Sequence, residues 1–352
     1  MSLWVDKYRP NSLRELDYHD SITEKLHRLS NSKDFPHLLV YGPSGVGKKT
    51  RINAILNELY GVHFDKLKVE LKQFTTPSNK KLEINVISSN YHIEITPSDL
   101  GIYDQVVIQD LIKELAQTRQ IDSNSKHKFK IVVFNEADSL SRNAQSALRR
   151  TMEKYMGNMR VILCCNMISK ILGPIRSRCL LVRIPAPAED EMCDVLLKCA
   201  KYEKLSLPQS IASKIAIECD GNMRKALLML EAHYVQQYPF EEGKSLPTTD
   251  WELYLNNIVQ TILRDQSPKS LYDIRGKLYQ LLANCIPANV IIKNLTMELL
   301  RNVDSDLQPQ IVAAAAEYEH RMQIGSKKIF HLEAFIAKVM SVYSQYLIDF
   351  AG

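Results

Sequence analysis

The stretch YGPSGVGKKT, Tyr41–Thr50, has the spacing of the glycine-rich loop that wraps the phosphates of a nucleoside triphosphate. The apolar run PHLLVY, residues 36–41, leads into it and predicts a short buried strand. The segment KKTRINAILNELYG, residues 48–61, repeats apolar residues at helical spacing. A glycine loop between a strand and a helix is the context that makes this motif specific for nucleotides. We therefore expect a nucleotide-binding α/β domain.

The loop supplies a cradle for phosphate. Glycines allow main-chain N–H groups to approach phosphate oxygens, and the N-terminus of the following helix favours an anion. Lys48 adds a positive charge that reaches the terminal phosphates. The expected ligand is ATP or ADP, and a plain glycine turn is the alternative. The predicted phosphate-binding residues are Gly42, Pro43, Ser44, Gly45, Val46, Gly47, Lys48, Lys49 and Thr50.

The first departure from an ordinary ATPase is at the position after the loop lysine. That position normally offers a Ser or Thr hydroxyl to magnesium, but here it is Lys49. Thr50 lies about 100° further round the helix and is aimed elsewhere. At an effective dielectric constant of about 20, a unit positive charge about 4 Å from a dication is repelled by roughly 8 kcal/mol. Lys49 must therefore point away or take the place of the metal against phosphate.

The second departure is in the strand signature IVVFNEAD, residues 131–138, whose counterpart in ATPases ends in Asp-Glu. Here Asn135 precedes Glu136, and an amide binds a hard cation more weakly than a carboxylate does. Glu136 keeps the position of a residual water-orienting base. Since both changes affect the magnesium shell, no metal ligand is assigned and hydrolysis is expected to be slow or absent. The alternative is an active site in which Thr50 or water completes the shell.

The chain is expected to form an α/β domain at 1–184, a small helical domain at 185–240 and a larger helical domain at 246–352. Helices separating short apolar strands predict a parallel sheet covered on both faces. Residues from about 67 to 90 alternate in polarity and predict an inserted β-hairpin. PAPAED, residues 185–190, and QQYPFEEGKSLPTTD, residues 236–250, have the composition of linkers.

The composition argues against several other classes of protein. No run approaches 18 apolar residues, and MSLWVDKYRP lacks the layout of a signal peptide, so neither membrane insertion nor secretion is expected. Seven cysteines without a CxxC spacing argue against a disulfide framework or a zinc site. The net charge of +5 permits a polyanionic partner without requiring one.

Several separated motifs, in the same order, resemble the small subunits of replication factor C, the eukaryotic sliding-clamp loader of the AAA+ class. They are WVDKYRP at 4–10, EITPSD at 94–99, AQSALRRTMEKY at 144–155, PIRSRC at 174–179 and GNMRKAL at 221–227. The resemblance covers essentially the whole chain. Within the family, the GKKT loop, the lost acidic residue, the hairpin and the ending IFHLEAFIAKVM, 329–340, are most similar to the subunit called five in yeast and three in humans.

The resemblance implies a lid domain and a collar domain after the AAA+ domain, and a partial ring with four other replication factor C subunits. Arg178 would be the arginine finger of a neighbouring site, where such fingers contribute about 10³ to 10⁵ in rate. Without the flanking match, an arginine just before a strand is more often a solvated surface charge. Asn166 would be the polar sensor near the terminal phosphate and Arg224 the second sensor. The residues expected over the adenine are Val5, Tyr8, Arg9 and Pro10, and Asp17 is a further expected nucleotide-binding residue.

The resemblance also implies contacts with primer-template DNA and with the sliding clamp. Arg142, Gln145 and Arg149 share one helical face, with a spacing that suits successive phosphates. We expect sequence-independent DNA contacts from Arg142, Arg149 and Lys170, and a solvated face is the alternative. The helix at 103–120 corresponds to the region through which relatives touch the clamp. The candidate clamp-binding residues, which could equally be core, are Val107, Ile108 and Leu111.

The leading hypothesis is a non-catalytic or weakly catalytic nucleotide-binding subunit of a nuclear, DNA-dependent ATPase complex. That complex would use ATP to open the clamp and load it at primer-template junctions in DNA replication and repair. A subunit that hydrolyses ATP at its own site is the second hypothesis. A P-loop small-molecule kinase is the third, and the long helical tail and the finger motif argue against it. No membrane partner is expected.

Overall fold

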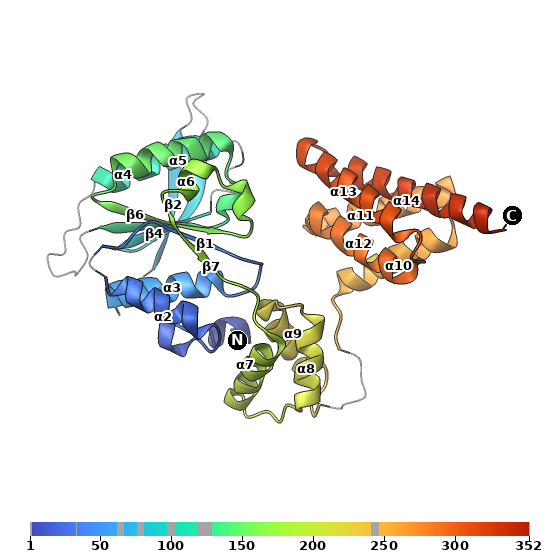
Figure 1. Ribbon diagram of the computed structural model, residues 1–352, viewed down its shortest axis with the longest axis horizontal. Helices are drawn as coiled ribbons and strands as arrows, with labels where there is room; N and C mark the ends of the chain where they lie inside the picture. Colours follow the sequence, from blue (N-terminus) through green and yellow to red (C-terminus); the bar gives the residue numbers. More distant parts are fainter. Residues whose placement is uncertain are drawn as a thin grey trace. The chain divides into compact units, whose positions relative to one another are not determined.

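The computed structural model describes residues 2–32, 34–61, 67–75, 81–96, 101, 103–117, 129–240 and 246–351. Residues 97–99 of the EITPSD motif and the end of the helix expected at 103–120 lie outside these ranges. The chain divides into two compact units, Met1–Leu246 and Pro247–Gly352. Figure 1 shows both units, each of which is described by itself below.

The first unit is built on a seven-stranded sheet with the order β2-β3-β4-β5-β6-β1-β7 (Figure 1). Five of its strands run parallel: β1 (Leu38–Tyr41), β4 (His92–Ile95), β5 (Lys130–Phe134), β6 (Met159–Cys165) and β7 (Leu180–Arg183). An antiparallel hairpin, β2 (Lys68–Thr75) and β3 (Lys81–Ser88), extends the sheet beyond β4. It lies in the segment for which the sequence predicts an inserted hairpin.

Helices cover both faces of this sheet (Figure 1). On one face lie α2 (Asp20–Ser30) and α3 (Lys48–Tyr60), and on the other lie α4 (Asp104–Gln117), α5 (Arg142–Lys154) and α6 (Gly173–Arg176). Alternate side chains of a strand point to opposite faces, so Leu38 and Val40 of β1 join the core beneath α3. Leu39 joins the core beneath α4 and α5. Burial on both faces explains why β1, β5 and β6 are continuous apolar runs.

The rest of the first unit is helical. The bundle α7 (Glu189–Tyr202), α8 (Gln209–Glu218) and α9 (Met223–Gln236) has its own apolar core. The N-terminal helix α1 (Trp4–Lys7) packs into that core, where the Trp4 ring lies 5.3 Å from the ring of Tyr234. Short 3-10 turns are η1 (Leu13–Glu15), η4 (Ala137–Ser139) and η5 (Ile168–Lys170). The first residues of the chain therefore pack with the small helical bundle, which is formed by residues far from them in the sequence.

The second unit consists of α10 (Asp250–Arg264), α11 (Pro268–Ala283), α12 (Ala288–Asn302), α13 (Gln308–Ile324) and α14 (Lys328–Ala351). A side-chain cap fixes the start of α11, where the hydroxyl of Ser267 accepts a hydrogen bond from the Ser270 N–H. The apolar stripe of α14, including Leu332, Phe335 and Ile336, is fully buried in this unit's own core. Among the described residues, no helix is both long and apolar enough to cross a membrane. The predicted fold, a parallel α/β domain followed by two helical regions, is confirmed.

Candidate nucleotide-binding site

A cavity of about 110 Å³ in the first unit lies between the glycine loop, the N-terminal segment and the helical bundle. It brings together residues that are separated by more than two hundred positions in the sequence. Of the predicted site residues, Gly45, Gly47 and Thr50 come from the loop and the start of α3, and Arg224 comes from α9. The full lining is Val5, Tyr8, Arg9, Pro10, Leu16, Asp17, Tyr18, Gly45, Gly47, Thr50, Val195, Met223, Arg224 and Leu227.

Two of the predicted nucleotide-binding residues in the N-terminal segment are held by the helical bundle. The Tyr8 hydroxyl donates a hydrogen bond to Glu203 Oε1 at 2.6 Å. Asp17 Oδ1 accepts one from Lys198 Nζ at 2.6 Å. Since these contacts join the N-terminal segment to α7 and its end, one wall of the cavity depends on how the bundle packs.

The glycine loop has the backbone conformation that a phosphate cradle requires. Gly45 and Gly47 have φ angles of +78° and +81°, in the left-handed region that side chains disfavour. Lys48 Nζ donates to the carbonyl oxygens of Gly42 and Pro43 at 2.8 and 2.6 Å. It also donates to Asn166 Oδ1 at 2.8 Å, so the predicted sensor lies beside the loop lysine. Burial lowers the pKa of Lys48, and neutral oxygens surround its ammonium group.

Asn222 closes the loop from the side of α9. A Cβ added to Gly45 would lie 1.7 Å from Asn222 Oδ1, so only glycine permits this approach. Asn222 is the N-cap of α9, and its Oδ1 accepts from the Lys225 N–H at 3.1 Å. Sequence reasoning missed Asn222. Its position just before α9, in GNMRKAL, was the available signal.

Tyr18 and Arg51 support the loop from behind, and neither was predicted. The Tyr18 hydroxyl donates to the Val46 carbonyl at 3.1 Å and would lie 2.4 Å from a Cβ added to Gly47. Arg51 is completely buried, and its Nη2 donates to the Tyr18 carbonyl at 2.7 Å. Its guanidinium carbon lies 4.5 Å from the centre of the Tyr18 ring. Its Nε and Nη1 have no hydrogen-bond partner among the described residues.

Lys49, which stands where a magnesium ligand is usual, forms an ion pair with Glu94. Lys49 Nζ lies 3.0 Å from Glu94 Oε2, and the Glu94 side chain is only 4% exposed. Asn135 Nδ2 donates a long, 3.5 Å hydrogen bond to the same carboxylate oxygen. The usual hydroxyl is replaced by a cation, and the usual carboxylate by an amide whose nitrogen faces Glu94. This donor set does not fit a magnesium ion. Glu94 was not predicted as a site residue.

Glu136 follows Asn135 at the end of β5 and takes a left-handed conformation with φ 51°. Its carbonyl accepts hydrogen bonds from the N–H and the hydroxyl of Ser139. Asp138 Oδ2 accepts from the main-chain N–H groups of Asn166 and Met167 at 3.3 and 3.4 Å. The β5 and β6 ends that carry Glu136 and Asn166 are therefore fastened together at the carboxyl edge of the sheet.

Arg178 does not line the cavity of its own chain. It lies on the surface between α6 and β7, where its Nη1 donates to the Pro174 carbonyl at 2.7 Å. Its Nη2 pairs with Glu153 Oε1 at 2.5 Å, and the same oxygen lies 3.4 Å from Arg149 Nε. Glu153 thus joins the predicted finger to a predicted DNA contact.

The predicted DNA-facing residues separate into two groups. Arg142, Arg149 and Lys170 are exposed. Gln145 is 2% exposed, and its amide donates to the Leu140 and Lys170 carbonyls and accepts from the Leu172 N–H. Gln145 is therefore not part of an exposed face, because its amide satisfies buried backbone groups.

The side chains of the candidate clamp contacts on α4 are buried. Val107, Ile108 and Leu111 are between 0% and 1% exposed and belong to the core beneath α4 and α5. This burial agrees with the alternative interpretation, in which the apolar stripe of α4 packs on the sheet, and a clamp contact through these side chains stays a prediction.

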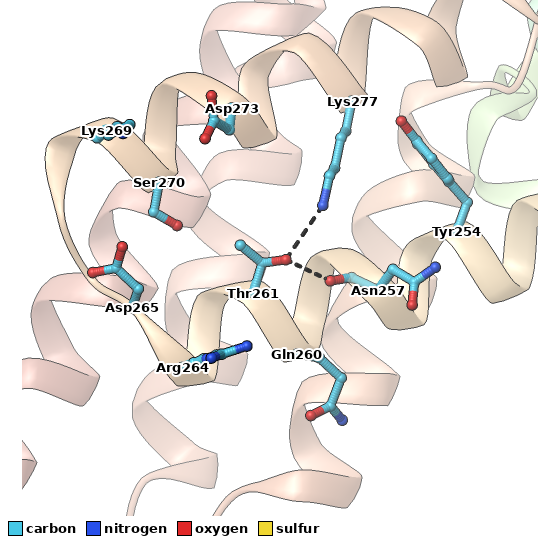
Figure 2. Close-up of a pocket in the computed structure, with 10 residues that line it drawn as sticks. All are labelled: Tyr254, Asn257, Gln260, Thr261, Arg264, Asp265, Lys269, Ser270, Asp273 and Lys277. Atoms are coloured by element: carbon cyan, nitrogen blue, oxygen red, sulfur yellow. Dashed lines mark hydrogen bonds between the residues drawn. The ribbon is translucent and has the colours of Figure 1, made fainter.

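The second unit contains a larger but different cavity. It measures about 670 Å³ and is lined by polar side chains of α10 and α11 (Figure 2). Lys277 Nζ donates to Thr261 Oγ1 at 3.3 Å, and that hydroxyl donates to the Asn257 carbonyl at 2.7 Å. No glycine loop borders it, and Asp265 and Asp273 offset its cations. The nucleotide site is therefore assigned to the first unit.

Comparison with known families covers most of the chain. The model described as Replication factor C subunit 3, C-terminal domain, matches residues 251–347. The model of the RCF1/5-like AAA+ ATPase lid domain matches residues 194–235, and that of the DNA polymerase III delta subunit matches residues 18–188. The human protein named replication factor C subunit 3 is 54% identical over 349 residues, which cover 99% of this chain and 98% of the human protein. The chain belongs to the replication factor C subunit family.

Other family members agree with this assignment. Replication factor C subunit 5 of Neurospora crassa is 51% identical over 349 residues, which cover 99% of both chains. The resemblance inferred from the motifs is confirmed. A solved structure of a RuvB mutant from Thermotoga maritima aligns with a TM-score of 0.52 and 14% identity, over 85% of this chain and 87% of that one. At that identity the likeness shows the fold alone.

Proposed function

We propose that this chain is a nucleotide-binding subunit of a nuclear clamp loader. Together with four other replication factor C subunits, it would help to open a sliding clamp with ATP and load the clamp at primer-template junctions. Full-length similarity to replication factor C subunits three and five supports this assignment. The observation that carries it is an intact phosphate cradle beside a magnesium position that an ion pair occupies.

The chain's own site binds ATP or ADP and hydrolyses ATP slowly or not at all. The glycine loop, Lys48 and the N-terminus of α3 attract the phosphates. Magnesium supplies charge neutralisation and a template for the attacking water in ordinary relatives of this fold. The pairing of Lys49 with Glu94 leaves no ligand set for that role. Arg224 lines the cavity and would contact the phosphates from the side of α9.

A second candidate, a site with activity of its own, has one observation in its favour. Thr50 lines the nucleotide cavity, although it is one residue beyond the usual magnesium ligand. Water would have to complete the rest of the shell. Glu136 would then orient the attacking water.

Through its own Arg178, the chain contributes to ATP hydrolysis at the nucleotide site of a neighbouring subunit. Its guanidinium is on the surface and outside its own cavity, as a residue acting in a partner's site must be. Near the terminal phosphate of that site it would stabilise charge that develops in the transition state. Arg142, Arg149 and Lys170 are exposed and suit salt-dependent contacts with DNA phosphates.

The test compares Lys48→Ala and Arg178→Ala in reconstituted five-subunit complexes. Arg178→Ala should lower hydrolysis at the neighbouring site by about 10³ or more. Lys48→Ala should leave most of the complex's hydrolysis intact, because it alters a site that turns over little. Steady-state ATP hydrolysis with primer-template DNA and clamp measures both effects. Arg176→Ala, on the same exposed turn, is the matched control. A larger loss from Lys48→Ala would favour the second candidate.

A further inference from the structure

The ion pair between Lys49 and Glu94 lies at the edge of an otherwise complete phosphate site. Lys49 belongs to the first turn of α3, immediately after the loop lysine. Its partner Glu94 projects from β4, beside the strand β5 that leads to Asn135. Two ammonium groups therefore stand at the helix end that receives the phosphates, and both are anchored by oxygen atoms of the protein.

Because Glu94 is buried, its carboxylate requires a cation such as the Lys49 ammonium beside it. A carboxylate that is 96% buried is costly unless an opposite charge or hydrogen bonds compensate it, and Lys49 and Asn135 supply both. An aspartate in place of Asn135 would bring a second carboxylate within about 4 Å of Glu94, a spacing at which like charges repel. The two departures from the ATPase pattern are thus linked. Lysine replaces the positive charge of the metal, and asparagine removes a negative charge that only a metal would offset.

The Lys49 ammonium remains available to a ligand. An ammonium group has three N–H donors, and the side chain is 42% exposed even while it pairs with Glu94. Lys48 is now held by three neutral oxygens, which a phosphate oxygen outcompetes as an acceptor because it is charged. Both lysines can therefore turn donors toward one polyphosphate tail.

We propose that this site binds its nucleotide without a divalent cation, with the Lys49 ammonium anchored by Glu94 as the built-in counter-charge of the terminal phosphates. The ligand class is a metal-free nucleoside di- or triphosphate. The inference rests on the nucleotide binding proposed above and adds the form of nucleotide that the site selects. Glu94 is the positioning residue, since it acts through Lys49.

The test is calorimetric titration of the full chain with ADP, and separately with ATP, in magnesium and in excess EDTA. The proposal expects each nucleotide to bind in EDTA as tightly as in magnesium or more tightly, because magnesium ions complex the free nucleotide that the site selects. A dissociation constant that is higher in EDTA by no more than about fivefold, or about 1 kcal/mol, counts as equal binding. Binding weakened by more than that in EDTA would overturn the inference while leaving the proposed nucleotide binding intact. Absence of binding in both buffers would instead overturn nucleotide binding itself, and the inference with it.

A double variant, Lys49→Thr with Asn135→Asp, tests the assignment to these residues. It rebuilds the ordinary magnesium shell and should bind ADP at least about tenfold more tightly in magnesium than in EDTA. Lys338→Thr, at an exposed position of α14, is the matched control and should behave like the parent chain. Equal binding by the double variant in both buffers would refute the role of Lys49. Thermal unfolding checks that the variants fold, and if the double variant does not, the parent chain in EDTA still decides.

Discussion

Arg51 is a buried side chain that supports the glycine loop through Tyr18 and does not line the cavity of the first unit. Its guanidinium is fully buried, stacks on Tyr18 and donates one hydrogen bond to the Tyr18 carbonyl. Two of its nitrogen atoms lack partners among the described residues. A buried charge with so few partners lowers stability. Arg51 also fixes Tyr18 against Val46 and Gly47. The protein is therefore less stable than it would be without this buried charge, but its phosphate loop is ordered.

Replacing Arg51 by methionine should separate stability from binding. Arg51→Met keeps most of the buried volume and removes the poorly compensated charge, so the free energy of unfolding should stay unchanged or rise by about 1 kcal/mol. ADP affinity should fall by about tenfold, the size of one charge-assisted hydrogen bond, because Tyr18 is released. Thermal unfolding and calorimetry measure the two quantities. Arg28→Met, at an exposed site on α2, is the control. Undiminished ADP affinity would contradict the positioning role.

The sequence was enough to identify the residues that differ from the ATPase pattern, but not the residues that they contact in the fold. Lys49 and Asn135 could be identified because each replaces an expected residue at a fixed spacing. Glu94 and Arg51 could not be identified, because no local pattern indicates which residues will meet in the fold. Glu94, for example, faces a lysine some forty-five positions away. Gln145 was misplaced for a related reason. Helical spacing groups residues by face, but it does not tell which polar side chain will satisfy buried backbone groups.

Elements combine these residues into units that can act together. Helix α5 carries Arg149 and Glu153 one turn apart, and the segment after α6 brings Arg178 to the same carboxylate. The three side chains are between 34% and 47% exposed, so these ion pairs are weak and exchangeable. If DNA phosphates draw Arg149 away, the charge environment of Arg178 changes with it. Glu153 thus offers a route from the proposed DNA contact at Arg149 to the proposed finger at Arg178.

Removing the charge of Glu153 should release Arg178. In the reconstituted complex, Glu153→Gln should raise hydrolysis without DNA by about fivefold at most, the limit set by an exposed ion pair. Stimulation by primer-template DNA should shrink accordingly. Hydrolysis rates with and without DNA give both numbers, and Glu24→Gln, in an exposed pair on α2, is the control. A lower rate without DNA would mean that Glu153 supports Arg178 instead of restraining it.

The type and order of the elements were predictable because their apolar periodicity reflects burial. Strands β1, β5 and β6 are apolar runs because both of their faces are covered. The apolar stripe of α4 was equally visible, but periodicity does not distinguish a core from a docking surface. Packing on the sheet agrees with the core, since Val107 and Leu111 have no exposed area.

The whole molecule consists of two compact units with separate cores. The sequence placed a domain boundary near residue 246 from its linker composition, whereas the packing of α1 with α9 was not foreseeable. Trp4 contacts residues more than two hundred positions away, and its main-chain N–H donates to Glu231 Oε2 at 3.1 Å. Local composition carries no information about such a contact. The finer division at 184 stays a prediction.

Nucleotide binding should be a property of the first unit alone. Every residue that lines the nucleotide cavity lies within 1–246. A fragment of residues 1–246 should bind ADP with a dissociation constant within about threefold of the full chain. Calorimetry makes the comparison, and the fragment 247–352, which lacks the glycine loop, serves as the negative control. A much higher dissociation constant for the fragment 1–246 would show that the second unit completes the site.

Both outer strands of the sheet present aliphatic side chains to water. Val69 and Leu71 of β2 are 71% and 66% exposed, and Leu180 and Leu181 of β7 are each 45% exposed. An outer strand also has unpaired amides that recruit strands of other molecules. Newly made copies without the other subunits of the complex are therefore prone to aggregate, although Lys68 and Lys72 flank the exposed Val69 and Leu71. Synthesis of this polypeptide in balance with the other subunits would be the simplest way for a cell to prevent its aggregation.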